Sequence, residues 1–156
     1  MLHQTIFRSF NVLGVIPGRY FPQPETYYLF NLGTAIEFFE LRNQEDVNHP
    51  TELISSRLFQ PLFSKALDIC IGPSYTMDSA GPFNVSLDSF FILRETDVVQ
   101  FQYSETDSLF VSINFINLPT YSITPNLGYY DFENDQLIIS CIHGGLCTID
   151  TSAPQW

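Results

Sequence analysis

Alternation of apolar and polar residues predicts that the second half of the chain is rich in β-strand. Residues 99–103 alternate Val, Phe and Tyr with Gln, and in 109–115 Leu, Val, Ile and Phe recur at every second position. A period of two predicts strands with one apolar face. Since Ser104 to Ser108 separates these segments, we expect a β-hairpin. Further strands are predicted at 86–94, 129–133, 136–143 and 146–150.

The N-terminal part is less regular. Residues 6–13 alternate as a strand does, and the glycines and prolines between residues 14 and 24 predict a loop. Residues 26–42 fit either a helix or a strand, since Gly33 interrupts apolar residues that recur at both spacings. The polar segment from Asn43 to Pro50 is predicted to be a loop that connects 26–42 to the segment after it.

The segment 51–69 carries the clearest helical pattern, because its apolar residues recur at a spacing of four. A proline removes a helical hydrogen bond and clashes with the preceding turn. Pro61 therefore divides the segment into two predicted short helices, at about 51–59 and 61–69. The apolar stripe consists of Ile54, Leu58 and Leu62.

Together these patterns predict an α+β fold, with a mostly antiparallel β-sheet covered by a small layer of short helices. The helices are those of segment 51–69, with 34–42 as a further candidate. We expect a single domain over residues 1–156, because a chain of this length buries about 70% of its unfolded surface in one core. Strand and loop occupy 1–50, and the strand-rich part is 84–150.

The net charge of -11 restricts the possible partners. Seventeen acidic residues face six basic ones, and no lysine or arginine follows Arg94. Nucleic acids and anionic membranes are bound by clusters of lysine and arginine, so neither is an expected partner. A strongly acidic domain attracts basic proteins by long-range electrostatics.

Three cysteines, an odd number without a dense framework, are typical of a reducing compartment. The first residues lack a basic segment leading into an apolar run, so no secretion signal is predicted. No run approaches the ~20 apolar residues that span a bilayer. We therefore expect a cytoplasmic protein.

The segment from Cys141 to Cys147 is the one local cluster that suggests a metal site or a nucleophile. In a two-residue turn at Gly144-Gly145, the two cysteines point to opposite faces, whereas a three-residue loop returns them to one face. No fourth zinc ligand is evident, so no metal or cofactor is predicted. A cysteine nucleophile is a further hypothesis, either Cys141 beside His143 or Cys70 paired with His49 or His3.

Other carboxylates fit known sites poorly. The run that begins at Asp131 spaces carboxylates as a calcium loop does, but positions six and twelve hold Gln136 and Ile142 instead of glycine and glutamate. Glu37 and Glu40 form an acid/base pair only if 34–42 is helical and a cleft sets their separation. The chain has no nucleophile elbow, phosphate loop or dinucleotide motif.

The function predicted from these features is that of a small acidic binding protein that neutralises a basic protein partner. An immunity or inhibitor protein that blocks a toxin active site is its concrete form. The alternative is a β-rich structural or assembly module of viral or phage type, and the third hypothesis is an enzyme whose site assembles from distant residues.

Exposed aromatic residues are expected as interface anchors, namely Tyr121, Tyr129, Tyr130 and Trp156. The predicted partner-binding carboxylates lie at strand ends: Glu95, Asp97, Glu105, Asp107, Asp131, Glu133 and Asp135.

Overall fold

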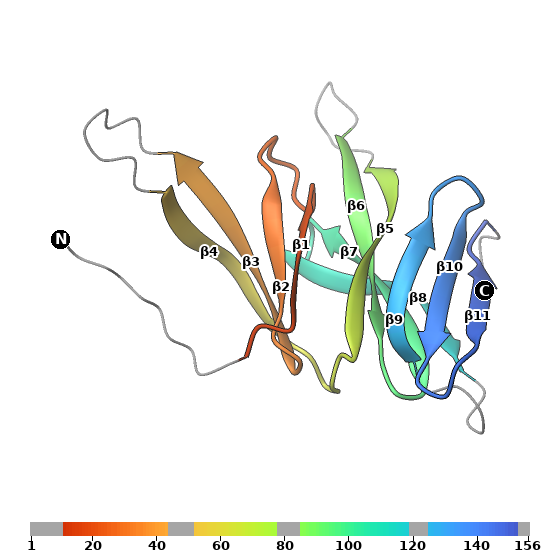
Figure 1. The fold of residues 1–156 in the computed structure, drawn as a ribbon. Coiled ribbons are helices and arrows are strands. Elements are labelled where there is room, and N and C mark those ends of the chain that lie inside the picture. Colours follow the sequence, from red (N-terminus) through yellow and green to blue (C-terminus); the bar gives the residue numbers. More distant parts are fainter. Residues whose placement is uncertain (1–10, 44–51, 78–84, 119–124, 153–156) are drawn as a thin grey trace.

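The structure is a computed structural model that describes residues 11–43, 52–77, 85–118 and 125–152. Within these ranges it contains eleven strands in three antiparallel sheets and no helix (Figure 1). The predicted α+β class is therefore wrong, and the fold is all-β. The described residues include no helix that is long and apolar enough to cross a membrane.

Each sheet is formed by strands that are consecutive in the chain. Sheet A consists of β1 (Gly14–Gly18), β2 (Tyr27–Asn31), β3 (Ala35–Asn43) and β4 (Glu52–Pro61). Sheet B consists of β5 (Asp68–Met77), β6 (Val85–Leu93), β7 (Asp97–Ser104) and β8 (Leu109–Asn117). Sheet C consists of β9 (Pro125–Asp131), β10 (Gln136–Cys141) and β11 (Leu146–Asp150).

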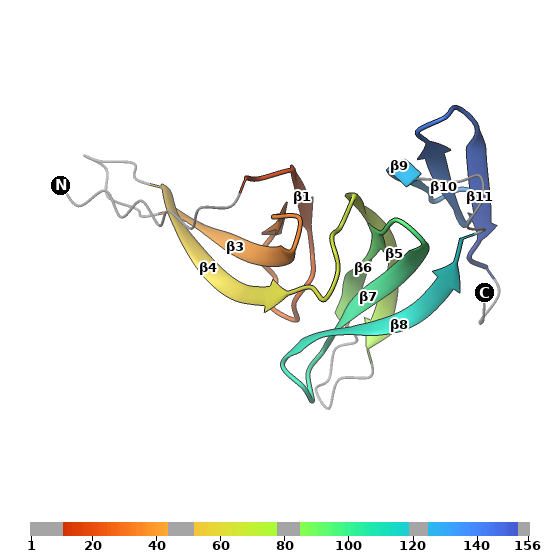
Figure 2. The same cartoon turned by 90° about the horizontal axis from the view of Figure 1, so that it is seen from below.

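Sheet B is the middle layer, with sheet A on one face and sheet C on the other (Figure 2). Alternate residues of β6 enter the two cores, because side chains of a strand alternate between faces. Phe90 and Ile92 pack in the core shared with sheet A, and Phe91 and Leu93 pack in the core shared with sheet C. A strand buried on both faces has a continuous apolar sequence, as these residues do.

Aromatic rings dominate the core between sheets A and B. The rings of Phe38 and Phe110 stack with their centroids 4.4 Å apart. Tyr20 meets both Phe38 and Phe90 edge to face. Such pairs add about 0.5–1.5 kcal/mol each to the burial of their area.

The two helices predicted at 51–59 and 61–69 are wrong, because this segment forms β4, the connection that follows it, and the start of β5. Phe38 pairs with Leu58 and Phe39 pairs with Ser56, so Arg57 is an extra residue that shifts the register. This β-bulge interrupts the regular alternation of faces along β4, so a strand period was not evident in the sequence. Pro61 is tolerated because β4 is an edge strand of sheet A.

The predicted loop at 14–24 begins instead with β1, an edge strand in which Pro17 pairs with Tyr28. The candidate helix at 34–42 is wrong as well, since residues 26–42 form the β2–β3 hairpin. At its turn the Gly33 N–H donates to Oδ1 of Asn31 over 2.9 Å, and Gly33 has a φ of 80°. Glycine adopts this left-handed conformation without steric cost.

The positions of the strands predicted for the second half of the chain are confirmed. The apolar face predicted for 109–115 is wrong, because Leu109, Ile113 and Phe115 are exposed, whereas the neighbouring Phe110 is buried. The hairpin of β7 and β8 turns between Ser104 and Leu109, as expected. The remaining predicted strands correspond to β6, β9, β10 and β11, with ends that differ by a few residues.

Candidate functional site

The outer face of sheet C is a patch of exposed apolar residues bordered by carboxylates. The inner face of sheet C packs against sheet B through Tyr130, Leu137, Ile139 and Ile149. Residues between these positions point outward, because side chains alternate along a strand. The outer face consists of Leu127, Tyr129, Asp131, Gln136, Ile138, Ser140, Leu146, Thr148 and Asp150.

Large apolar side chains form the centre of this face. Tyr129 is 67% exposed, Leu127 is 60% exposed and Leu146 is 74% exposed. Ile138 lies directly between Tyr129 and Thr148 across the three strands. Contiguous exposed apolar residues with a polar rim are typical of a surface that meets another molecule.

Two carboxylates flank this centre at one end. Gln136 pairs with Asp131 on one side and with Asp150 on the other. Hydrogen bonds from Asn134 and from the Glu133 N–H hold the pKa of Asp131 below its ordinary value. Ser152 lowers the pKa of Asp150 in the same way. Both carboxylates therefore stay ionised to a lower pH than an ordinary aspartate.

The seven carboxylates predicted as a contact surface lie at three separate turns. Glu95 lies in the β6–β7 turn and Asp97 is the first residue of β7. Glu105 and Asp107 lie in the β7–β8 turn, at the other end of this strand. The third group, Asp131, Glu133 and Asp135, lies at the β9–β10 turn of sheet C. The structure therefore does not join them into one surface.

Several of these carboxylates also have partners within the chain. The carboxylate of Asp97 forms an ion pair with the guanidinium of Arg94. Asp107 accepts from the Ser104 hydroxyl over 2.7 Å. Asp135 accepts from the hydroxyl of Tyr130 over 3.2 Å. Asp131 is therefore the predicted carboxylate that lies on the outer face of sheet C. Asp150, its counterpart across Gln136, was not predicted, because strand register is needed to place it there.

The predicted aromatic anchors differ in their positions. Tyr129 is exposed on sheet C, as expected. Tyr130 is 2% exposed and stacks on Phe91, so its assignment as an exposed anchor is wrong. Tyr121 and Trp156 lie outside the described residues.

The β10–β11 hairpin has a three-residue loop. The N–H of Cys141 donates to the carbonyl of Gly145 over 3.1 Å, and Ile139 pairs with Cys147. This register returns Cys141 and Cys147 to the same face of the sheet, so the two-residue turn is wrong. Both thiols are free, and no group of three metal-ligating side chains occurs among the described residues.

Cys70, one of the two proposed cysteine nucleophiles, lacks an activating environment in the described ranges. Burial and the neighbouring Asp68 raise the pKa of the Cys70 thiol, and burial raises that of Cys147. A raised pKa leaves less of the reactive thiolate at neutral pH. His3 and His49, the expected partners of Cys70, lie outside the described residues.

The pair formed by Glu37 and Glu40 is not a catalytic dyad in this structure. Both residues lie on β3, three positions apart, so their side chains point to opposite faces. Glu37 is 5% exposed and accepts a hydrogen bond from the Ser56 hydroxyl over 2.7 Å.

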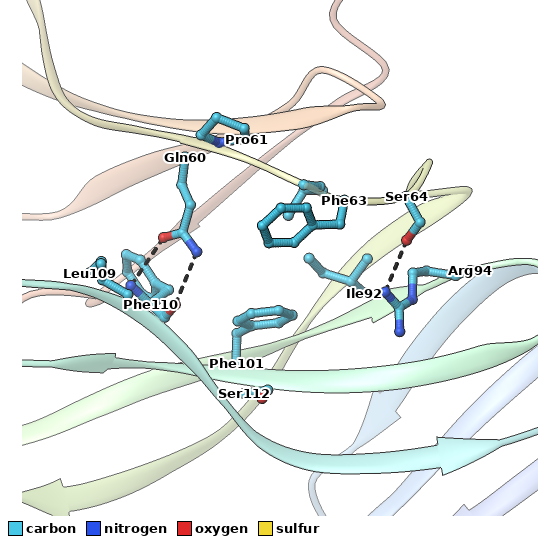
Figure 3. Close-up of a pocket in the computed structure, with 11 residues that line it drawn as sticks. Gln60, Pro61, Phe63, Ser64, Ile92, Arg94, Phe101, Leu109, Phe110 and Ser112 are labelled. Carbon is cyan, nitrogen blue, oxygen red and sulfur yellow. Dashed lines mark hydrogen bonds between the residues drawn. The ribbon is translucent and has the colours of Figure 1, made fainter. Parts of the chain in front are cut away.

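A cavity of about 320 Å³ lies between the β4–β5 connection and sheet B (Figure 3). The rings of Phe63 and Phe101 lie on its opposite sides. Its lining is mostly apolar and also includes Leu62, Ile92, Leu109 and Phe110. Gln60 and Arg94 are among the polar residues at its wall.

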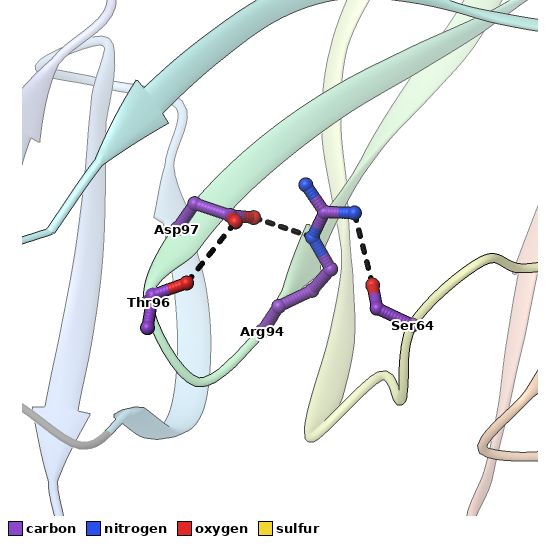
Figure 4. Close-up of polar contacts among 4 residues, drawn as sticks. All are labelled: Ser64, Arg94, Thr96 and Asp97. Carbon is purple, nitrogen blue, oxygen red and sulfur yellow. Dashed lines mark hydrogen bonds and ion pairs between the residues drawn. The ribbon is translucent and has the colours of Figure 1, made fainter.

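Arg94 connects this cavity with a second one of about 260 Å³. Its Nε donates to Asp97 and its Nη1 donates to the hydroxyl of Ser64 over 2.9 Å (Figure 4). Ser64 lines both cavities, and Lys65 lines the second. Two of the six basic residues of the chain therefore lie at adjoining cavities.

Comparisons with protein-family models and with curated proteins find no match to this chain.

Proposed function

We propose that the chain is a binding protein for a basic protein partner, with the outer face of sheet C as its contact surface. The observation that carries this proposal is the exposed apolar centre of that face beside the ionised carboxylates Asp131 and Asp150.

The two parts of the face have different roles in binding. Exposed aromatic and aliphatic side chains at the centre of an interface supply most of the affinity once they are buried. Tyr129 is the most suitable anchor, because a tyrosine combines a large apolar ring with a hydroxyl that remains hydrogen-bonded. Charges at the rim speed association and select partners of opposite sign.

The sign of the charge expected on the partner follows from the sequence around this face. Residues 95–156 contain no lysine or arginine, so the face has no cation of its own to balance Asp131 and Asp150. Lysine or arginine side chains of a partner would supply that balance. A partner held in this way has its basic surface covered, which is how a steric inhibitor acts. Neutralisation of a toxin, the form expected from the sequence, stays a prediction.

A β-rich assembly module is the second candidate function. The feature that favours it is the same uncovered sheet face, since a second copy of the chain could bury the apolar centre. The repulsion between two acidic copies favours the basic partner instead.

Selection from a displayed library of random peptides tests the proposal. We expect the protein to enrich peptides that combine lysine or arginine with an aromatic or aliphatic residue, and the affinity to fall as salt concentration rises. Tyr129→Ser and the pair Asp131→Asn with Asp150→Asn should each weaken binding of the enriched peptides at least tenfold.

Matched variants elsewhere serve as controls. Val15→Ser removes an exposed apolar residue from sheet A, and Glu105→Gln with Asp107→Asn removes two carboxylates from the β7–β8 turn. These variants should bind as the unmodified protein does. Enrichment of peptides without basic residues, no enrichment, or equal losses in the controls would overturn the proposal. Concentration-dependent dimers that Tyr129→Ser abolishes would support the assembly module instead.

A further inference from the structure

The cavity next to Phe63, whose ring is fully exposed to solvent, combines a mostly apolar wall with a single cationic group. Apolar side chains from the β4–β5 connection and from three strands of sheet B form most of its wall. At one end of the cavity, the amide nitrogen and the amide oxygen of Gln60 both hydrogen-bond to the backbone of Phe110. Arg94 lies at the wall next to Ile92, so the polar recognition group of this cavity is a guanidinium (Figure 3).

Arg94 is held in place and still has donors to offer. A guanidinium carries five N–H groups, and two of its nitrogens donate to Asp97 and Ser64. Nη2 makes no hydrogen bond to the described residues and points away from both partners (Figure 4). Because the neighbours fix the orientation of the side chain, a ligand that binds Nη2 loses little additional entropy.

We propose that this cavity binds a small amphipathic carboxylate, with its hydrocarbon part between Phe63 and Phe101 and its carboxylate on Arg94. This proposal does not rest on the proposed function, since the cavity lies on the face of sheet B that is turned away from sheet C.

The size of the cavity sets the size of the ligand. At the ~30 Å³ that a water molecule occupies in the liquid, a volume of about 320 Å³ holds roughly ten non-hydrogen atoms. An eight-carbon monocarboxylic acid such as octanoic acid has this size. The second cavity, with Lys65 at its wall, leaves room for water around the carboxylate.

Local charges favour one negative charge on the ligand. Lys65 and Arg94 are balanced by Glu95 and Asp97, which line the same second cavity. A monoanion takes the remaining donors of Arg94, whereas a dianionic phosphate would bring a second charge close to Asp97. The overall charge of -11 opposes binding only weakly at physiological salt, because distant charges are screened beyond about 8 Å.

Calorimetric titration with octanoate, octanol and octyl phosphate tests this inference on the full chain. We expect octanoate to bind at least tenfold more tightly than octanol, and octyl phosphate to bind more weakly than octanoate. Arg94→Gln should lower the affinity for octanoate at least tenfold and leave that for octanol within about threefold, since a hydrogen bond to a charged group contributes about 1.5–3 kcal/mol.

Two further variants keep the test decisive if Arg94→Gln unfolds. Ser112→Leu fills the cavity from β8 and should abolish binding of both octanoate and octanol. Arg19→Gln makes the same change of charge at an exposed site outside both cavities and should bind octanoate normally. Equal affinity for octanoate and octanol, full affinity in either cavity variant, or no binding of octanoate would overturn the proposal.

Discussion

The side-chain amide of Gln60 takes the place of a neighbouring strand for the backbone of Phe110. Its Nε2 donates to the carbonyl of Phe110 over 3.0 Å, and its Oε1 accepts from the N–H of Phe110 over 3.1 Å (Figure 3). Phe110 lies on β8, an edge strand of sheet B, and Gln60 lies on β4, an edge strand of sheet A. This pair of bonds therefore joins two sheets at their edges and satisfies backbone groups that would otherwise lie at an open edge.

Replacement of Gln60 by leucine should destabilise the protein by about 2 kcal/mol, because the backbone groups of Phe110 lose both partners while an apolar side chain of similar size remains. Urea unfolding followed by circular dichroism measures this change. Gln23→Leu, at an exposed position, should change the stability by less than about 0.5 kcal/mol. Equal stability of the two variants would show that the Gln60 bonds contribute nothing.

Gly72 is required by close packing at a β-bulge of β5. The pairing of β5 with β6 shifts between Ile71 and Ser74, and a Cβ on Gly72 would lie 2.7 Å from both the Phe91 ring and the Ser89 hydroxyl. Gly72→Ala should therefore destabilise the protein by about 2–3 kcal/mol through overpacking.

Gly14→Ala is the matched control, since a Cβ there meets nothing within 4 Å. Thermal unfolding measures the stability of both variants, and Gly14→Ala should be neutral or slightly stabilising. A Gly72→Ala variant with an unchanged melting temperature would contradict the assigned packing.

Asp68 should make the protein less stable as the pH rises through the acidic range. Burial raises the pKa of this carboxyl, although a hydrogen bond from the Gly128 N–H opposes the change. Below the unfolded-state pKa, near 3.9, both states hold the proton and there is no penalty. Above the raised folded-state pKa, the folded protein must hold a partly buried charge, so its stability is lower.

The variant Asp68→Asn keeps an oxygen for the Gly128 N–H and removes the charge. It should unfold at a higher urea concentration than the unmodified protein at neutral pH, and the two should converge as the pH falls below about 4. A difference that is constant with pH would mean that the charge of Asp68 is not its cause.

The fold could be predicted from the sequence where regular alternation persists. The β7–β8 hairpin is such a case for the positions of its strands and turn. Its buried face was not predicted, because the pairing shifts between Gln100 and Phe101 and Phe110 is the buried residue at the start of β8. Prediction failed at β4, where the extra residue Arg57 interrupts the strand period and the apolar spacing of four also fits a helix. It also failed at β1, because an edge strand tolerates Pro17 in a way that sequence alone does not reveal.

Less of the candidate sites could be predicted, because they depend on how strands pair and how the chain crosses between sheets. Asp131 and Tyr129 were expected at a contact surface, and both lie on the outer face of sheet C. Asp150 joins them only through the pairing of β10 with β11, which depends on the length of the hairpin loop. The position of Arg94 between two cavities depends on how the β4–β5 connection crosses sheet B, and no local pattern encodes that crossing.

Cys70 should be the least reactive of the three cysteines in the native protein. Its side chain packs against the core between sheets B and C, and burial together with Asp68 raises the pKa of its thiol. An ordinary thiol, with a pKa near 8.5, becomes much more reactive between neutral pH and pH 9 because the thiolate forms. Cys70 should stay unlabelled by iodoacetamide over that range and react only after unfolding in urea. Mass spectrometry of digested protein identifies the labelled residue, and Cys70→Ser should leave the extent of native labelling unchanged. Rapid labelling of Cys70 in the folded protein would mean that sheet C separates from sheet B far more readily than its packing implies.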